Sequence, residues 1–544
     1  MTRGSSHTTR CAGVVFVVAL TLLMLPGASV GAQAQPDVAP AVRSVGEGTA
    51  EAAAGAAKAT PQQNRTQRRR TTSRTPVRTT RAASPSASFS SPRSASALAA
   101  DLGSVLGAHT RSGVWGVMVV SITRGDTLFS ANPDMLLKPA SIMKMMTTGL
   151  ALEKFGPAHR FETEVLRDTP VNNGVLEGPL FLRGGGDPTL SLRFWQGESP
   201  MDALAKQVAG AGITRVRGDV IADEGAFALE RIPHGWKTTY LMSAYAAPVS
   251  ALSLNENLVW IVARAENGQA VVELEPATTA IPITSSVKVV GGSGGRVVAR
   301  RNNEGGITVT GTIGSRSAPR RYSLVVQEPP TFAAGALLAS LKANGVEVEG
   351  AIRAGSTPQG AERVAVIHSL PMAQMVSYMN RESINHFAEL LYRNAARDNG
   401  GQASSQSALE SLRAFLSSKA GTRPTDIRVS DGSGLSEADS LTARAMVQLL
   451  SYAHKSSWGS VFHASMPVAG ESELMRRRMR ATPAQGNLHA KTGTTNTVAS
   501  LTGYVTALNG EVLAFAFIYN GRDRFGARAT MDRMGPTLAN FYRD

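Results

Sequence analysis

The stretch Lys138-Pro-Ala-Ser-Ile-Met-Lys144 opens a helix that is apolar on most sides, and this helix is the strongest constraint on the fold. Pro139 suits the first helical turn, because a missing N–H costs nothing there. Gly156 follows Phe155 and can end the helix. A helix that is apolar around most of its circumference has to be buried. We therefore predict that residues 139–155 form a buried helix.

Ser141 and Lys144 lie three residues apart on this helix, so their side chains share one face and can touch. A serine hydroxyl becomes a nucleophile when an adjacent base takes its proton, and a desolvated lysine with a lowered pKa can be that base. Ser141 would also lie near the helix N-terminus, which favours negative charge. Ser-x-x-Lys also occurs by chance on exposed helix faces. The pair therefore predicts a catalytic centre only in combination with further motifs.

The chain has 544 residues, which suggests two to four domains. Residues 33–95 carry ten Lys or Arg and three Asp or Glu, so +7 of the formal net charge of +15 lies in this short segment. Residues 96–544 carry only +6. Most of the chain is therefore only mildly basic, and no nucleic-acid partner is expected.

The N-terminus is typical of a secretory signal peptide over residues 1–32. It has a basic start, an apolar core from Gly13 to Leu25, and small residues before a cleavage site after Ala32 or Ala34. A membrane anchor is the alternative, but the apolar run is shorter than the roughly 20 residues that a span needs. We expect export to the periplasm or cell envelope. The single cysteine, Cys11, lies in the predicted signal, which excludes disulfides and cysteine chemistry from the mature chain.

Residues 33–95 are rich in Ala, Ser, Thr, Pro and Arg and show no apolar periodicity. This composition predicts a disordered basic linker. A solvated linker is the simplest interpretation, and contact with anionic envelope polymers or with nucleic acid is the less favoured functional alternative.

After the linker, predicted segments of mixed helices and strands lie on both sides of a long strand-rich block. A helix at 97–106, strands at 114–122 and 127–130, and the helix that carries Ser141 make up residues 96–158. Residues 159–357 read as one or two inserted β-rich domains with short strands and glycine turns. Helices are expected at 372–398, 406–418, 442–454 and 530–542, and strands at 488–493, 499–506 and 512–519. The two N-terminal and three C-terminal strands are expected to form one antiparallel sheet between helices, with residues 358–544 as the second part of that domain.

Two further motifs carry candidate functional residues. Ser383 and Asn385 lie two residues apart at the start of a predicted helix or loop, where a hydroxyl could relay a proton and an amide could hold a carbonyl group. Lys491-Thr492-Gly493 ends a short strand, where a cation and a hydroxyl could bind a carboxylate and glycine allows close approach to the backbone. A helix N-cap and a plain strand end are the structural alternatives.

In this order, the three motifs resemble the signature of penicillin-binding proteins and serine β-lactamases: Ser-x-x-Lys, Ser-x-Asn and Lys-Thr-Gly. A gap of 242 residues separates Ser141 from Ser383, and 108 residues separate Ser383 from Lys491. The long first gap resembles the class C low-molecular-mass penicillin-binding proteins, which are D-alanyl-D-alanine carboxypeptidase/endopeptidases of the penicillin-binding protein 4 type. Further matches are Gly186-Asp-Pro-Thr-Leu and Ser430-Asp-Gly-Ser-Gly-Leu-Ser. The resemblance covers residues 97–544.

The resemblance implies an α/β (α+β) fold with an antiparallel sheet flanked by helices and two inserted β-rich domains. It implies an exported enzyme that cleaves peptidoglycan peptides ending in D-Ala-D-Ala, with β-lactams as covalent inhibitors and no metal or cofactor. The roles that it implies follow the motifs. Ser141 is the nucleophile, Lys144 the base, Ser383 and Lys491 the proton relay, and Asn385, Thr492, Gly493 and Thr494 bind the substrate, with the N–H groups of Ser141 and Thr494 as the oxyanion hole.

Two positions depart from the family pattern and put a preference for a diaminopimelate stem peptide in doubt. Glu437 stands where some relatives carry a basic residue that helps bind the side chain of the stem peptide. In the loop from Phe227 to Trp236, where relatives can place an acidic contact for that side chain, Arg231 lies beside Glu230. A serine β-lactamase and a non-catalytic cell-wall-binding protein are the alternative functions.

Overall fold

The computed structural model describes residues 89–544, except 108–112, 196, 303–304 and 398–400. The predicted signal peptide and nearly all of the predicted basic linker lie outside these residues. The described residues belong to one compact unit. Among the residues described, no helix is both long and apolar enough to cross a bilayer.

A five-stranded antiparallel sheet joins the two ends of the described chain in the order β2-β1-β22-β21-β20. Its strands are β1 (Gly113–Ser121), β2 (Thr127–Ala131), β20 (His489–Thr494), β21 (Val498–Thr506) and β22 (Val512–Gly521). Val117 of β1 lies opposite Phe517 of β22. The predicted sheet of two early and three late strands is therefore confirmed.

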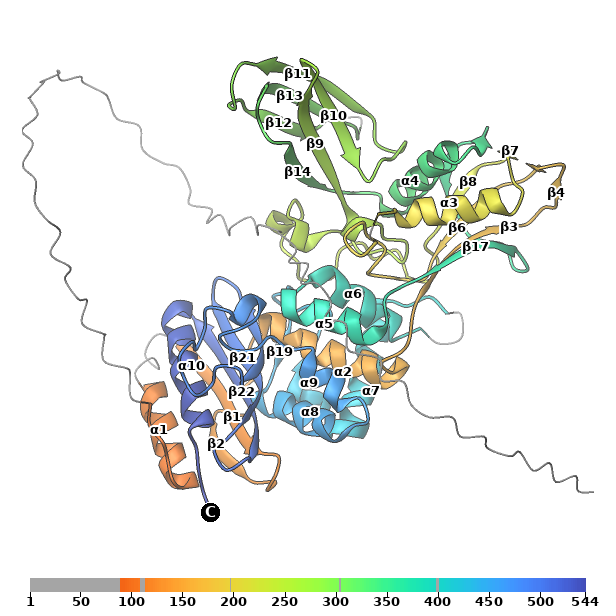
Figure 1. Cartoon of the computed structure of the whole chain (residues 1–544). Helices are drawn as coiled ribbons and strands as arrows, with labels where there is room; N and C mark the ends of the chain where they lie inside the picture. Colours follow the sequence, from red (N-terminus) through yellow and green to blue (C-terminus); the bar gives the residue numbers. More distant parts are fainter. Residues whose placement is uncertain (1–88, 108–112, 196, 303–304, 398–400) are drawn as a thin grey trace, which may run out of the picture. The chain divides into compact units, whose positions relative to one another are not determined.

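Helices cover both faces of this sheet (Figure 1). Side chains alternate along a strand, and on β22 Phe515 and Phe517 pack with α1 (Ala95–Gly107) and α10 (Arg524–Ala539). Ala516 and Ile518 face the opposite side and belong to the cluster of α8 (Ala443–Lys455). This alternation explains why β22 is almost wholly apolar.

The helix that carries the Ser-x-x-Lys motif lies inside the helical cluster. In α2 (Met143–Phe155), every residue from Met143 to Leu152 is buried, which confirms the predicted buried helix. Its neighbours are α5 (Met372–Glu382), α6 (Asn385–Asn394), α7 (Ser405–Phe415), α8 and α9 (Gly459–Ala464).

The block that follows α2 contains four small sheets. The largest has the order β16-β8-β6-β3-β17, and a second has the order β15-β7-β5-β4. Their strands are β3 (Glu162–Arg167), β4 (Val171–Asn172), β5 (Val175–Leu176), β6 (Leu180–Gly184), β7 (Arg215–Val216), β8 (Val220–Asp223), β15 (Glu347–Val348), β16 (Ile352–Ala354) and β17 (Glu362–His368). The other two sheets, β10-β9-β14 and β11-β13-β12, are built from β9 (Leu258–Glu266), β10 (Gln269–Glu275), β11 (Ile283–Val290), β12 (Val297–Arg301), β13 (Ile307–Gly314) and β14 (Arg320–Val325).

Two helices in this block were not predicted. Ser199 caps α3 (Pro200–Gly210) by accepting a hydrogen bond from the N–H of Asp202, and two prolines open α4 (Pro329–Ala343). Both helices border glycine turns and short strands, which dominated the sequence pattern. Strand β17 lies beyond residue 357 and pairs with β3, so it belongs to the sheet of this block.

Of two predicted helix starts, one is confirmed and one is wrong. Helix α8 begins after Thr442, whose hydroxyl accepts a hydrogen bond from the N–H of Ala445, as predicted. The last helix begins at Arg524, six residues earlier than predicted, because Asp523 caps it through the N–H of Gly526. A two-stranded ladder of β18 (Ile427–Arg428) and β19 (Ser440–Leu441) completes the fold.

Candidate active site

Ser141 lies in a short 3-10 turn, Ala140–Ile142, that leads directly into α2. The residue before it, Ala140, has φ +50°, a left-handed conformation that is strained for alanine. Gly434 packs against this turn so closely that a Cβ atom there would lie 1.9 Å from the carbonyl oxygen of Ala140. The backbone around Ser141 is therefore fixed by contacts with a segment almost 300 residues away.

Lys144 is fully buried and has three polar partners. Its Nζ lies 3.1 Å from Ser141 Oγ, 2.6 Å from Asn385 Oδ1 and 2.9 Å from the carbonyl oxygen of Ser433. Burial lowers the pKa of Lys144 to about 8, because the charged form loses its hydration. A neutral amine within hydrogen-bond distance of a serine hydroxyl is the arrangement that a general base requires.

A second lysine and serine form a matching pair. Nζ of the buried Lys491, on β20, donates to Ser383 Oγ at 2.9 Å and to the carbonyl oxygen of Thr492 at 2.9 Å. Burial, and then the nearby charge of Lys144, hold the pKa of Lys491 well below its ordinary value. Two buried ammonium groups repel each other, so this site favours states in which at least one amine is neutral.

Ser383 and Asn385 owe their positions to the break between α5 and α6. Ser383 ends α5 in the left-handed region at φ +62°, and Asn385 begins α6. The Asn385 amide accepts from Lys144 through Oδ1 and donates through Nδ2 to the carbonyl oxygen of Tyr245 at 2.9 Å. The side chain of Asn385 therefore connects the lysine to the inserted block.

The edge strand β20 passes directly beside the nucleophile. A Cβ atom on Gly493 would lie 2.6 Å from the carbonyl oxygen of Pro139 and 3.1 Å from the peptide nitrogen of Ser141, so glycine is needed for this approach. Thr492 is half-buried and Thr494 is exposed. The strand thus brings the Lys-Thr-Gly segment to the backbone of Ser141.

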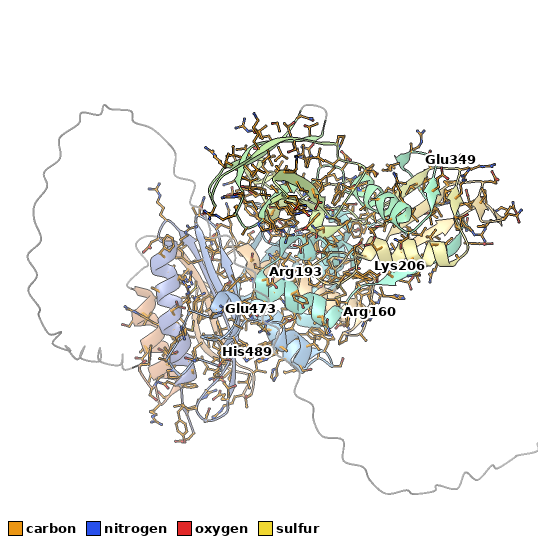
Figure 2. The ribbon with its side chains drawn as sticks, turned by 45° about the horizontal axis from the view of Figure 1, so that its top comes forward. Arg160, Arg193, Lys206, Glu349, Glu473 and His489 are labelled. Carbon is orange, nitrogen blue, oxygen red and sulfur yellow. The ribbon has the colours of Figure 1, made fainter. Side chains whose placement is uncertain are left out.

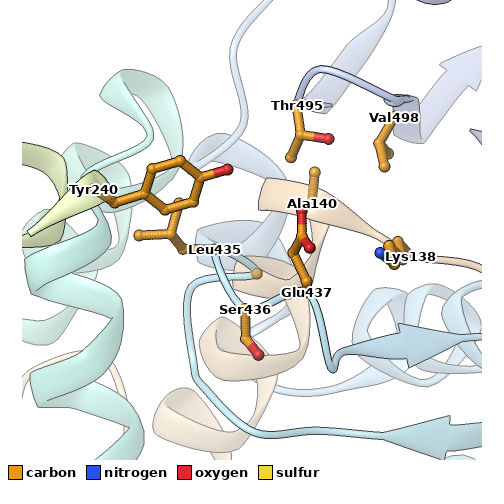
Figure 3. Close-up of a pocket in the computed structure, with 9 residues that line it drawn as sticks. Lys138, Ala140, Tyr240, Leu435, Ser436, Glu437, Thr495 and Val498 are labelled. Carbon is orange, nitrogen blue, oxygen red and sulfur yellow. The ribbon is translucent and has the colours of Figure 1, made fainter. Parts of the chain in front are cut away.

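A small pocket lies beside Ala140, the residue before Ser141, and Figure 3 shows its lining. It is bounded by Lys138 and Ala140 and by residues from three other stretches: Tyr240, Gly434, Leu435, Ser436, Glu437, Thr495 and Val498. Glu437 forms an ion pair with Lys237 at 2.5 Å. The acidic residue that departs from the family pattern is therefore neutralised by a cation of the inserted block.

The second departure is also neutralised within the protein. Arg231 pairs with Glu224, and Glu230 accepts from the N–H of Ser405 at 2.9 Å. Arg193 of the inserted block (labelled in Figure 2) pairs with Glu382 at the end of α5, next to Ser383. The Arg193–Glu382 ion pair therefore joins the block to α5, the helix that ends at Ser383.

The structure brings the predicted site residues together through several direct contacts. Ser141, Lys144 and Asn385 form one hydrogen-bonded group, Ser383 and Lys491 form a second, and Gly493 lies against Ser141. Sequence reasoning missed the carbonyl groups of Ser433 and Tyr245. Ser433 lies in the segment 430–436 that matched the family pattern, but that match assigned it no contact. No group of three His, Cys, Asp or Glu residues in the described part of the chain is suited to a metal ion.

The chain is similar to known proteins over most of its length. The model of the D-Ala-D-Ala carboxypeptidase 3 (S13) family matches residues 98–541. A D-alanyl-D-alanine carboxypeptidase of Actinomadura sp. (strain R39) is 33% identical over 452 residues, which cover 79% of this chain and 81% of the relative. The carboxypeptidase DacB of Haemophilus influenzae is 26% identical over 75% of this chain and 85% of the relative. The crystal structure of penicillin-binding protein 4 (dacB) from Haemophilus influenzae has a TM-score of 0.67 at 23% identity and covers 81% of this chain and 98% of the other, so it shares the fold.

Proposed function

Because the chain belongs to the D-Ala-D-Ala carboxypeptidase 3 (S13) family, we propose that its catalytic centre is the group around Ser141. The protein is a serine-type D-Ala-D-Ala carboxypeptidase that binds penicillin and acts on peptidoglycan peptides. The single observation that supports the proposed centre is the 3.1 Å contact between Ser141 Oγ and the buried amine of Lys144.

The reaction would begin at this contact. The neutral Lys144 amine takes the hydroxyl proton while Ser141 Oγ attacks the carbonyl carbon of the penultimate D-alanine. The N–H groups of Ser141 and Thr494 would stabilise the resulting oxyanion, because β20 passes within van der Waals contact of the Ser141 backbone. A preorganised donor of this kind contributes about 3–4 kcal/mol to transition-state stabilisation.

The second pair would serve the leaving group. Lys491 donates to Ser383 Oγ, and this hydroxyl can pass a proton to the amine of the departing D-alanine as the C–N bond breaks. Asn385 would hold the substrate carbonyl, and Thr492 and Thr494 would bind the terminal carboxylate. Water then hydrolyses the ester on Ser141 and releases the shortened peptide. An endopeptidase reaction on cross-linked peptides would use the same steps with a longer leaving group.

Export and the basic tail remain part of the proposal. We expect cleavage of residues 1–32 and a location in the periplasm or cell envelope, where the substrate is found. Residues 33–95 are proposed as a linker that can contact anionic envelope polymers through its arginines. Deletion of residues 33–95 should leave cleavage of soluble peptides unchanged, and a large loss of activity would contradict the linker role.

Fluorescent penicillin tests the proposed centre. We expect a stable covalent adduct on the wild-type protein and no adduct on Ser141→Ala. Ser417 is an exposed serine that follows α7, so the control variant Ser417→Ala should label normally. Rapid release of hydrolysed penicillin would indicate a β-lactamase, and a wild-type protein without adduct would indicate a wall-binding protein. Mass analysis of digested muropeptides then measures D-alanine release against cross-link cleavage.

A further inference from the structure

A buried carboxylate holds together the turn that contacts Lys144. Asp431 is 1% exposed and accepts five hydrogen bonds. Its Oδ1 accepts from the N–H groups of Ser433 at 3.0 Å and Gly434 at 2.6 Å. Its Oδ2 accepts from the N–H of Ser436 at 2.7 Å, from Ser433 Oγ at 3.2 Å and from Nε1 of Trp236 at 2.7 Å. Four of these bonds fix the turn 431–436, and the fifth comes from the inserted block.

The turn presents one atom to the catalytic lysine, the carbonyl oxygen of Ser433. A neutral amine has two N–H groups and one lone pair. The Ser433 carbonyl and Asn385 Oδ1 can only accept hydrogen bonds, so they take up the two N–H groups. The lone pair is then left for the third neighbour, Ser141 Oγ. The position of the Ser433 carbonyl therefore decides whether the amine can accept the serine proton.

We propose that Asp431 and Trp236 are positioning residues for acylation. Asp431 holds the turn whose Ser433 carbonyl orients the amine of Lys144, and Trp236 makes this turn depend on the inserted block. The inference rests on the proposed function of Ser141 and Lys144. It assigns the inserted block a part in the chemical step, in addition to any part in substrate binding.

Further contacts join the same two stretches of chain. Ser436 Oγ donates to the carbonyl oxygen of His234 at 2.8 Å, and the N–H of Glu437 donates to the carbonyl oxygen of Gly235 at 3.2 Å. Gly235 has φ +83°, and a Cβ atom there would lie 2.2 Å from Ser436 Oγ. The segment 234–237 is thus fitted to the turn 431–437 by its backbone, and Trp236 is buried, at 8% exposed.

The charges around Lys144 give the inference a distinct signature. Asp431 and Glu389 both favour the protonated amine, and Lys491 faces the site from β20. Asp439 lies beside Asp431, and burial raises the pKa of Asp439 well above its ordinary value. Loss of the charge on Asp431 would lower the pKa of Lys144, whereas general loosening of the fold would reduce the rate without moving its pH dependence.

The decisive experiment compares two tryptophan variants. Trp236→Phe keeps an aromatic ring but removes the N–H that donates to Asp431. Trp458→Phe is the matched control, because Trp458 is also buried and its Nε1 donates to a carboxylate, Glu153, at 3.1 Å. The rate constant of acylation by fluorescent penicillin and the dissociation constant of the initial complex are measured separately. We expect Trp236→Phe to slow acylation about three- to tenfold at unchanged dissociation constant, and Trp458→Phe to match the wild type.

Asp431→Asn provides a second, independent test. We expect a loss of at least about 100-fold in the acylation rate, and a shift of the acid side of the pH profile to lower pH. Equal acylation rates in Trp236→Phe and the control would overturn the inference, as would an Asp431→Asn profile that keeps its pH dependence. If one variant does not fold, as judged by its thermal transition, the other decides. Failure of the wild type to form an adduct on Ser141 would instead refute the proposed function.

Discussion

The pH dependence of acylation is the sharpest test of the proposed base. Lys144 acts as a base only when its amine is neutral, and burial lowers its pKa from 10.5 to about 8. At pH 7, about one-tenth of such an amine is neutral, compared with about one part in 3,000 for an ordinary lysine. Burial therefore raises the reactive fraction about 300-fold. The acylation rate should therefore rise with pH and level off above pH 8.

The rate of acylation by fluorescent penicillin, measured by rapid mixing between pH 5.5 and 9, checks this expectation. Below pH 7 the rate should change about tenfold per pH unit, and from pH 7 to pH 8 about fivefold. Lys144→Met, which keeps a long apolar side chain in the buried site, should lose acylation by a factor of at least about 1,000 and show no such pH dependence. Because Lys491 is also buried, the measured midpoint belongs to the pair of lysines.

Two results would refute this reasoning. A rate that is flat between pH 5.5 and 8 would mean that proton transfer to Lys144 does not limit acylation. A rate that still rises steeply at pH 9 would mean that the lysine keeps an ordinary pKa and that burial does not activate it.

Three further predictions concern other parts of the site and fold. Gly434→Ala should lower the free energy of unfolding by about 2–3 kcal/mol in urea denaturation, because its Cβ would meet the carbonyl oxygen of Ala140 and its φ is +80°; an unchanged midpoint would contradict the close approach. Burial, followed by two neighbouring histidines, lowers the pKa of His463 to about 4, so the stability that it contributes above pH 6.5 is lost as the pH falls toward 4. Allowing for its partial exposure, His463→Gln should reduce this acid-induced loss by about 1–2 kcal/mol in urea titrations at pH 7.5 and 4.5, and an equal loss in both proteins would exclude His463 as its source. Ser383→Ala, which removes the partner of Lys491, should slow release of D-alanine about 100-fold in a peptide assay while penicillin binding persists, and an unchanged rate would remove Ser383 from the proton relay.

The fold of the catalytic part was largely predictable from local patterns. The apolar residues of β22 and the buried residues of α2 gave clear periodicity, and the sheet of early and late strands followed from their positions on either side of the inserted block. Helices α3 and α4 were missed because short strands and glycine turns surround them. The start of α10 was predicted too late, because its N-cap, Asp523, comes only two residues after the end of β22, and the hydrophobic pattern does not mark this change from strand to helix.

The candidate site was predictable in its residue types but not in its contacts. The motifs named Ser141, Lys144 and Lys491, and their roles remain predictions. No local pattern could indicate that Asp431 meets Trp236, because these residues are 195 positions apart and the motif at residues 430–436 does not indicate which residue contacts Asp431. Contacts of this kind depend on the packing of the whole unit.

The pairing of β1 with β22 has a consequence for biosynthesis. Gly113 lies opposite Gly521, so the middle of the sheet is complete only when almost the whole chain has been made. During synthesis, β1 lacks its central neighbour while some 390 residues follow. The sheets of the intervening block can form first and shorten the distance between the two ends. A nascent or truncated chain that ends before Val512 lacks this strand, and it should be recognised by quality-control proteases as an unfinished protein and acquire no reactivity towards penicillin.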